Sequence, residues 1–368
     1  MNAGILHELH ATAGARLLEP EQGGALLTYG DVPAEYEAAT RACVLFDQTG
    51  RGCVRARGAE AGAFLQRLLA NDVLALAPSQ VARNLLLSPK GKVRFDFDLA
   101  RIGDEYLLST APGEGASLLV ALDTYLFTEQ VELSDESDAH APLCVLGPDS
   151  SALVERALDV AAPREDLRVT AARFEGGALS IATMVQFGSR ALRLDAGPER
   201  APALWTALRE AGARPAGRVV ADILRVEAGA AQSPDDLDET VYPQEARLER
   251  AFSLEKGCYI GQEVVAKIDT YGGLNKRLVA LRVSHDDPVA RGTRLHRRDE
   301  ERDEWRDVGV VTSWAYSFVL DTGLVLAFVK RRHQAAGTRF RLADGPAEAT
   351  VVPLPVRPGA VPPTGVFE

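Results

Sequence analysis

Apolar and polar positions change places in short runs along most of the chain, and this pattern predicts a protein that mixes helices with strands. Residues 59–70 place their large apolar side chains at helical spacing, which predicts a helix packed through one face. Residues 84–87 and 93–99 alternate apolar and polar side chains, as strands do. Because such elements follow one another as far as residue 211, we expect an α+β body with antiparallel sheets.

The sequence changes in character at Arg277, where short β-rich segments divided by turn residues begin. They predict a small all-β domain closed as a barrel. Before it, residues 227–242 are rich in glycine, proline and acids and predict a long polar loop. We therefore expect an N-terminal α+β body over 1–140, a second α+β part over 141–275, a C-terminal β-barrel over 276–355 and a proline-rich tail over 356–368.

The composition limits the function classes. A chain of 368 residues that is 46% hydrophobic is expected to form two or three packed domains. Its 52 acidic residues against 41 basic ones give a net charge of -11, which disfavours nucleic acid as a partner. The N-terminus lacks the basic start and apolar run of an export signal, and no stretch reaches the roughly 20 apolar residues of a membrane span. We expect a cytoplasmic protein that binds no membrane.

The cysteine and histidine positions do not suggest a metal centre. Cys43, Cys53, Cys144 and Cys258 stand far apart without a CxxC pair, which fits reduced thiols rather than a disulfide framework. A pair of N-terminal histidines three residues apart has no acidic or thiol ligands at matching spacing, so packing or capping is expected of it. We predict no metal site.

The sharpest local signal is the run KGCYIGQE at residues 256–263. Two glycines bracket a thiol and an aromatic ring, which is typical of a tightly turned loop. A thiol beside Lys256 has its thiolate form favoured by the positive charge, provided that the site is exposed. The alternative is that Cys258 is a small buried apolar side chain, since free cysteine is among the most buried residue types.

This run resembles the signature of the YgfZ-like folate-binding proteins, a branch of the glycine-cleavage T-protein superfamily that maintains iron-sulfur clusters. The resemblance makes Cys258 the functional residue, and it places around it a signature loop that consists of Lys256, Gly257, Tyr259, Gly261, Gln262 and Glu263. The runs RVEAG (225–229) and YPQEA (242–246) resemble the stretch that leads into the equivalent loop of aminomethyltransferases. The runs LFD and GRGCVRARG near residues 45–58 and GVVTS near residue 309 extend the resemblance to both ends.

The resemblance implies a T-protein-like ring of three domains, with antiparallel sheets plus helices and a C-terminal all-β barrel. It also implies tetrahydrofolate, or a one-carbon derivative of it, in the central hole. Glu227 is the first residue expected to bind folate, because its counterpart in the T-protein meets the pterin, and Arg225 belongs to the same stretch. A carboxylate can accept two parallel N–H bonds from a pterin edge. The alternative for Glu227 is a solvated position before a loop.

Asp96 is the second residue expected to contact folate. It lies in GKVRFDFDL, which resembles the GG-x-x-DD stretch of aminomethyltransferases, but Phe95 stands where the first aspartate would fall. An aspartate there is implicated as a base or an electrostatic group, and phenylalanine can be neither. Asp96 or Asp98 can substitute for it; alternatively, both lie on the polar face of a half-buried strand.

Three hypotheses for the function follow. The first is a tetrahydrofolate-binding accessory protein that assembles or repairs iron-sulfur clusters, with client iron-sulfur proteins or assembly factors as partners. The second is a tetrahydrofolate-dependent aminomethyltransferase of the glycine cleavage system, which takes the one-carbon unit from a lipoyl carrier and releases ammonia. The third is a non-catalytic binding module that has kept the fold. Whether the protein is an enzyme stays open between them.

Overall fold

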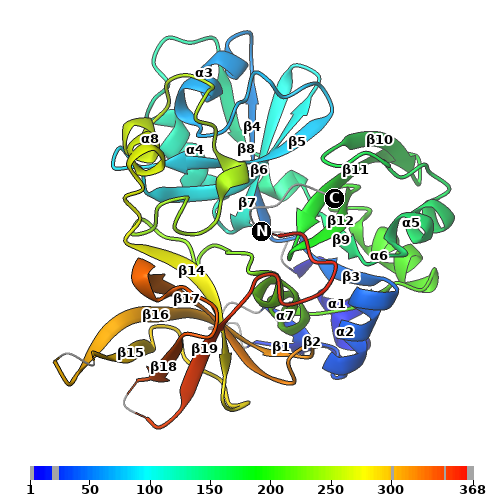
Figure 1. The fold of residues 1–368 in the computed structure, drawn as a ribbon. Helices are drawn as coiled ribbons and strands as arrows, with labels where there is room; N and C mark the ends of the chain where they lie inside the picture. The colour runs from blue at the N-terminus through cyan, green and yellow to red at the C-terminus, as the bar shows by residue number, and fades with distance from the viewer. Residues whose placement is uncertain (1–3, 19–24, 300–301, 344, 363–368) are drawn as a thin grey trace. The chain divides into compact units, whose positions relative to one another are not determined.

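The computed structural model describes residues 4–18, 25–299, 302–343 and 345–362 (Figure 1). The chain divides into two compact units, each built from two separate stretches: residues 1–86 with 95–221, and residues 87–94 with 222–368. The predicted domain borders at residues 140 and 275 stay a prediction, and the last part of the expected tail, residues 363–368, lies outside the described residues. No helix in the described part of the chain is long and apolar enough to span a membrane.

The first unit contains a five-stranded sheet in the order β5-β6-β7-β4-β8. Along β6 the side chains of Phe97 and Leu99 are buried, while Asp96 and Asp98 lie on the opposite, polar face, as the period of two in a strand requires. The predicted helix 59–70 is present as α3, which buries its apolar face. The elements of this part are β4 (Arg51–Arg57), α3 (Ala61–Leu68), β5 (Gln80–Leu87), β6 (Val93–Ile102), β7 (Glu105–Pro112), α4 (Gly115–Asp123) and β8 (Glu132–Asp135).

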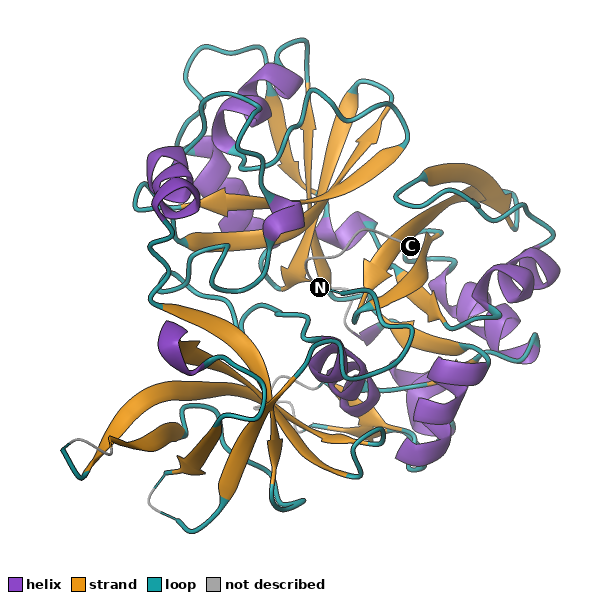
Figure 2. Cartoon of the chain, viewed as in Figure 1, coloured by secondary structure: helices purple, strands orange, loops and turns teal. Residues whose placement is uncertain are grey.

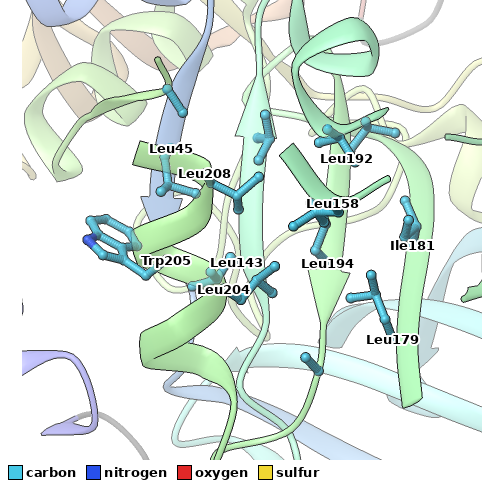
Figure 3. Close-up of a cluster of buried hydrophobic side chains, with 14 of the residues drawn as sticks. Leu45, Leu143, Leu158, Leu179, Ile181, Leu192, Leu194, Leu204, Trp205 and Leu208 are labelled. Atoms are coloured by element: carbon cyan, nitrogen blue, oxygen red, sulfur yellow. The ribbon is translucent and has the colours of Figure 1, made fainter. Parts of the chain in front are cut away.

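The first unit also contains a six-stranded sheet in the order β10-β11-β12-β9-β3-β13. Its described neighbours are antiparallel except β13, which pairs in parallel with β3. Trp205, Leu204 and Leu208 of α6 pack on the sheet and are fully buried (Figure 3). Burial of each such side chain contributes about 2 kcal/mol. The elements are β3 (Val44–Asp47), β9 (Leu143–Leu146), α5 (Ser150–Leu158), β10 (Val169–Phe174), β11 (Gly177–Gln186), β12 (Ser189–Asp195), α6 (Ala201–Glu210) and β13 (Arg214–Pro215).

The second unit contains the closed barrel β14-β17-β16-β15-β18-β19, which Figure 2 shows as a region built mainly of strands. Strand β17 is buried at every position except Lys330, because β14 and β16 flank it and alternate side chains fill the barrel interior. The predicted all-β C-terminal domain is therefore present. Its strands are β14 (Lys276–Val283), β15 (Arg294–Asp299), β16 (Glu304–Ser317), β17 (Thr322–Lys330), β18 (Arg339–Leu342) and β19 (Glu348–Val352).

Three of the longer helices lie outside the predicted elements: α2 (Val32–Arg41), α7 (Arg218–Ala228) and α8 (Gln262–Tyr271). The beginning of α2 has a local signal, because the Asp31 side chain accepts a hydrogen bond from the Ala34 N–H and proline follows in the first turn. Helix α7 extends into the predicted loop 227–242, and after Ala228 that loop has no regular element. The remaining short elements are α1 (His7–Thr12), β1 (Arg16–Leu17) and β2 (Leu26–Thr28).

Candidate functional site

The signature loop of the second unit exposes its thiol. Cys258 is exposed, whereas the other three cysteines are buried, so the interpretation of Cys258 as a buried apolar side chain is wrong. The Lys256 ammonium lies 5.1 Å from the centre of the Tyr259 ring, which is itself buried. Burial raises the pKa of the Tyr259 hydroxyl to about 12.

Gly261 gives the loop its sharp turn into α8. Its φ of +80° lies in the left-handed region, and a Cβ there would stand 2.6 Å from the Ser88 carbonyl oxygen. The partner turn contains Gly91, whose own Cβ would meet Val264 at 3.0 Å. The segment 88–91 and the start of α8 thus approach each other so closely that side chains are excluded from both glycine positions.

Glu227 lies at the end of α7 and is fully buried. One carboxylate oxygen accepts a hydrogen bond from the Ser317 hydroxyl at 2.7 Å, and Arg357 lies 3.8 Å from the other. Its backbone carbonyl accepts the Val356 N–H at 2.7 Å, which fixes the beginning of the proline-rich segment against α7. The alternative of a solvated Glu227 is therefore wrong, and its role toward folate stays a prediction.

Arg225 is the centre of a buried ion cluster. Its guanidinium is 2.7 Å from Asp222, 2.7 Å from Asp236 and 3.6 Å from Asp235, and it donates a hydrogen bond to Ser313 of the barrel. Burial lowers the pKa of Arg225, but Asp236 and Asp222 outweigh it, and the net effect is to raise the pKa. These contacts join α7 to the barrel, and a folate contact of Arg225 stays a prediction.

Asp236 is a residue whose importance the sequence does not reveal. Its side chain is fully buried, and its carboxylate accepts hydrogen bonds from Arg225 and from the Ser313 hydroxyl at 2.7 Å. In the sequence it is one of several acids in the run PDDLDE, and only the fold shows that this one is buried against Arg225.

Lys92 ties the segment 87–94 to the loop that contains YPQEA. Its ammonium stands 3.1 Å from the centre of the Tyr242 ring and donates a hydrogen bond to the Thr240 carbonyl oxygen at 2.9 Å. Glu245 lies 3.8 Å away. Burial lowers the pKa of Lys92 by more than Glu245 raises it.

Two buried polar atoms near this loop have no hydrogen-bond partner among the described residues: Gln244 Oε1 and the Tyr259 hydroxyl. The amide nitrogen of Gln244 donates to the Val265 carbonyl oxygen of α8 at 2.9 Å, which orients its oxygen. A buried acceptor and a buried donor without partners are the kind of groups that a polar ligand satisfies.

Asp96 lies in the first unit, in a bidentate ion pair. Arg83 donates to both carboxylate oxygens of Asp96, at 2.7 and 2.6 Å. Phe95 points to the opposite face of β6, the face that also carries the buried Phe97. The interpretation that Asp96 and Asp98 lie on the polar face of a half-buried strand is therefore confirmed, without excluding a role toward folate.

Asp98 is shared by two arginines. Arg193 donates to it at 3.0 Å, and Arg51 lies 3.8 Å away. Burial and the neighbouring Arg193 lower the pKa of Arg51. Arg51 and Arg193 come from parts of the sequence 142 positions apart by number, and no pattern along the chain indicates that they meet.

His140 holds a second polar cluster in the first unit. Its ring hydrogen-bonds the Asp195 carboxylate and Cys53, and Glu136 lies 3.7 Å away. Burial alone would lower the pKa of His140, but the bonds to Asp195 and Cys53 raise it to about 10.

Of the two N-terminal histidines, His10 is a packing residue, whereas His7 is exposed. His10 is buried and packs edge-on against Trp205. The Asp47 carboxylate accepts a hydrogen bond from its Nε2, and its Nδ1 shares a hydrogen bond with the Tyr29 hydroxyl, both at 2.8 Å. Across the described ranges, no group of three or more histidine, cysteine or acidic side chains is arranged to hold a metal ion.

The predicted site residues thus fall into two sets. Asp96 belongs to the first unit, whereas Arg225, Glu227 and the signature loop belong to the second. After that loop, α8 ends and β14 begins with a basic pair that is already engaged: Lys276 lies over the Phe328 ring, and Arg277 binds Glu249 at 2.6 Å.

Comparison with known sequences assigns both parts of the chain. The family described as GCVT N-terminal domain matches residues 6–256, and the family described as Glycine cleavage T-protein C-terminal barrel domain matches residues 276–356. The aminomethyltransferase of Rubrobacter xylanophilus is 31% identical over 95% of this chain and 92% of its own length. The aminomethyltransferase of a Thermus thermophilus strain is 31% identical over 96% of this chain and 98% of its own length. The aminomethyltransferase of Chlorobium limicola is 29% identical over 92% of this chain and 94% of its own length.

Comparison with solved structures supports the same fold. The crystal structure of the glycine cleavage system aminomethyltransferase T from Bartonella henselae superposes with a TM-score of 0.84. The match covers 96% of this chain and 97% of that one, at 22% sequence identity. The predicted α+β fold with antiparallel sheets and a C-terminal barrel is therefore confirmed.

Proposed function

The chain belongs to the glycine cleavage T-protein family, and we propose that it is a tetrahydrofolate-dependent aminomethyltransferase. The observation that carries the proposal is the similarity over nearly the whole chain, in both family regions, to proteins named aminomethyltransferase. This is the second of the three hypotheses from the sequence. The relatives favour it over the YgfZ-like branch.

The reaction takes an aminomethyl group from the sulfur of a lipoyl carrier. Two bonds form between the methylene carbon and two folate nitrogens, while the carbon–sulfur bond and the bond to the amine break. The two protons released from the folate nitrogens go to the carrier thiol and to the departing ammonia. Asp96, held in place by Arg83, would supply a fixed negative charge beside the folate nitrogen that becomes positive during the attack.

The residues of the second unit fit a folate substrate in their chemistry. Gln244 Oε1 and the Tyr259 hydroxyl offer a buried acceptor and a buried donor, and Glu227 offers a buried carboxylate of the kind that binds a pterin edge. Because one oxygen of Glu227 already accepts the Ser317 hydroxyl, a pterin would bind in addition to that contact. Arg225 is expected to keep α7 in place rather than touch the ligand.

The test is an assay of the purified full chain with tetrahydrofolate and an aminomethylated lipoyl carrier. We expect methylenetetrahydrofolate and ammonia to form in equal amounts. Asp96→Asn should lower kcat at least about a hundredfold, which is the usual loss when a charged group in the reaction is neutralised. Asp104→Asn, at a fully exposed position of the β6–β7 turn, is the matched control and should keep full activity.

Folate binding is measured separately by titration of tryptophan fluorescence, with Glu227→Gln as the variant. Binding without turnover would reject the transferase while keeping a folate protein. Failure of both binding and turnover would leave the third hypothesis, the non-catalytic module.

A second candidate function rests on the exposed thiol of Cys258. In this alternative the protein binds folate and uses Cys258 to maintain iron-sulfur clusters in client proteins. Cys258→Ser would then keep folate binding but lose the ability to restore an iron-sulfur enzyme in cells that lack this protein. An aminomethyltransferase whose Cys258→Ser variant turns over normally and still restores that enzyme would reject the alternative.

A further inference from the structure

A basic groove of about 590 Å³ lies on the C-terminal barrel, within the second unit. It is lined by residues of β15, β18 and β19, by one residue of β16 and by the turn before β18. Its charged and aromatic lining residues include Arg297, Arg298, Arg339, Arg341, Trp305 and Glu348.

The groove opens where two neighbouring strands separate. Strands β15 and β18 pair at Leu295 with Leu342 and at His296 with Arg341. Both strands continue, but the described ladder does not include the next positions, Arg297 and Phe340. On its other side β15 pairs with β16, and on its other side β18 pairs with β19. Beyond His296 and Arg341, the edges of β15 and β18 that face each other therefore have no strand partner in the described ladder.

The side chains around this gap are cationic and partly apolar. Arg297 and Arg339 are exposed, and Arg298 forms an ion pair with Asp303 at 2.7 Å. The guanidinium of Arg341 lies 4.4 Å from the centre of the Trp305 ring, which is 50% exposed. Glu348 is the one acid among the described lining residues.

A neighbouring histidine lies in the same positive surroundings. His333 packs its ring edge-on against Phe340 of β18. Burial lowers the pKa of His333, and so do Arg297, Arg332 and Lys330. The basic face therefore extends past the groove to the run Lys330–His333, in a chain that is acidic as a whole.

We propose that this groove binds an extended acidic peptide segment of a partner protein. The open strand edges supply backbone donors and acceptors to an added strand, and alternate side chains of that strand face the arginines. Planar guanidinium groups bind carboxylates in pairs of hydrogen bonds, and the exposed Trp305 face covers an apolar neighbour. Nucleic acid or free phosphate would use the charge but not the strand edges. The site is independent of the transferase reaction.

The test uses the full chain and a fluorescein-labelled peptide of alternating glutamate and valine, about ten residues long to match a strand. Fluorescence anisotropy should show saturable binding that weakens with salt. The double variant Arg297→Glu/Arg339→Glu should lose at least about tenfold in affinity, because charge reversal at both edges repels the peptide. Arg164→Glu, at a side chain that is 89% exposed in the first unit, makes the same change elsewhere and should bind normally.

Two modified peptides and two other anions test which features of the acidic peptide the groove recognises. A peptide with glutamine in place of glutamate and a peptide methylated at its backbone nitrogens should both bind at least about tenfold more weakly, since each lacks one half of the recognition. Oligothymidylate or inorganic phosphate that binds more tightly than the acidic peptide would overturn the proposal. Equal binding of the methylated peptide, or unchanged binding by the double variant with a native circular dichroism spectrum, would also overturn it.

Discussion

Two arginine–aspartate pairs in this chain look alike in geometry but stand in different surroundings. Arg225 and Asp236 join α7 to the barrel with side chains that are 4% and 0% exposed. Arg83 and Asp96 join β5 to β6, and their side chains are 35% and 12% exposed. Arg225 also contacts Asp222 and Ser313, whereas the side chain of Asp96 is bound by the partly exposed Arg83.

The difference distinguishes charged side chains that stabilise the fold from charged side chains that can also bind a substrate. Arg225 and Asp236 are both buried and engage each other, so either one is costly to disturb and neither is suited to meet a substrate. A carboxylate held by one partly exposed arginine can keep its orientation and still face a ligand. The comparison therefore favours Asp96 over Arg225 as the residue that touches folate.

The largest effect is expected from Asp236→Asn. Removing this charge leaves Arg225 buried with a weaker set of partners, which should lower the free energy of unfolding by about 3 kcal/mol. Urea unfolding of Asp236→Asn and of the control Asp235→Asn measures it, because Asp235 lies 3.6 Å from Arg225 and is 21% exposed. If both variants lost the same free energy of unfolding, a buried aspartate would be no more important to Arg225 than a half-buried one, and the prediction would be contradicted.

An intermediate effect on stability is expected from His140→Asn. The side chains of His140 and of its partner Asp195 are 22% and 16% exposed. Its pKa is raised from 6.5 to about 10 in the folded chain, so the folded state holds a proton that the unfolded state loses above about pH 6.5. The stabilisation is complete below that pH and is lost as the pH rises toward 10. His140→Asn should lower the free energy of unfolding at acid pH by about 1–3 kcal/mol and remove this alkaline dependence.

A smaller effect on stability is expected from Asp96→Asn. Because Arg83 is partly exposed, the pair should contribute only ~0.5–1 kcal/mol to the free energy of unfolding. Thermal unfolding at low and high salt measures this contribution, which salt should reduce further. A loss as large as that of Asp236→Asn would mean that Asp96 is a structural residue and would remove the argument for its role in catalysis.

The smallest effect is expected from Glu263→Gln in the signature loop. Glu263 pairs with Lys267 one turn along α8, and both side chains are mostly exposed, at 81% and 63%. The pair lowers the pKa of Glu263, but water screens it. We expect a melting temperature indistinguishable from that of the parent chain, and a clear decrease would show that exposure alone does not rank these pairs.

The sequence predicted the parts of the fold that depend on local pattern. The α3 helix, the alternation along β6 and the β-rich barrel follow from spacing and are present. The tight turn around Cys258 follows from its two glycines, whereas the exposure of its thiol is a finding of the structure. Helices α7 and α8 were missed for different reasons. Apolar residues of α7, such as Val219, Val220 and Ile223, do stand at helical spacing, but the helix continues into the polar segment 227–242. Helix α8 begins inside a glycine-bracketed loop.

The hydrogen-bond and ion-pair partners of the site residues could not be predicted from the sequence, for a different reason. Arg83 reaches Asp96 across a turn, but Asp98 meets Arg193 from another sheet, and Asp236 meets Ser313 from the barrel. These contacts depend on how sheets and loops pack, which no spacing along one strand encodes. The resemblance to a family indicates Glu227 and Arg225 as candidate folate-binding residues. It does not indicate that Arg225 is engaged in ion pairs with Asp222 and Asp236.

The placement of residues 87–94 has a consequence for how the protein is made. This short segment belongs with residues 222–368, although it is synthesised between two long stretches of the other unit. Its contacts, from Val93 to Val241 and from Lys92 to Thr240, form only after the ribosome has added about 150 further residues. Neither unit can therefore be expressed as one uninterrupted gene fragment, and a chain truncated at residue 221 would leave that segment without the surface it packs on.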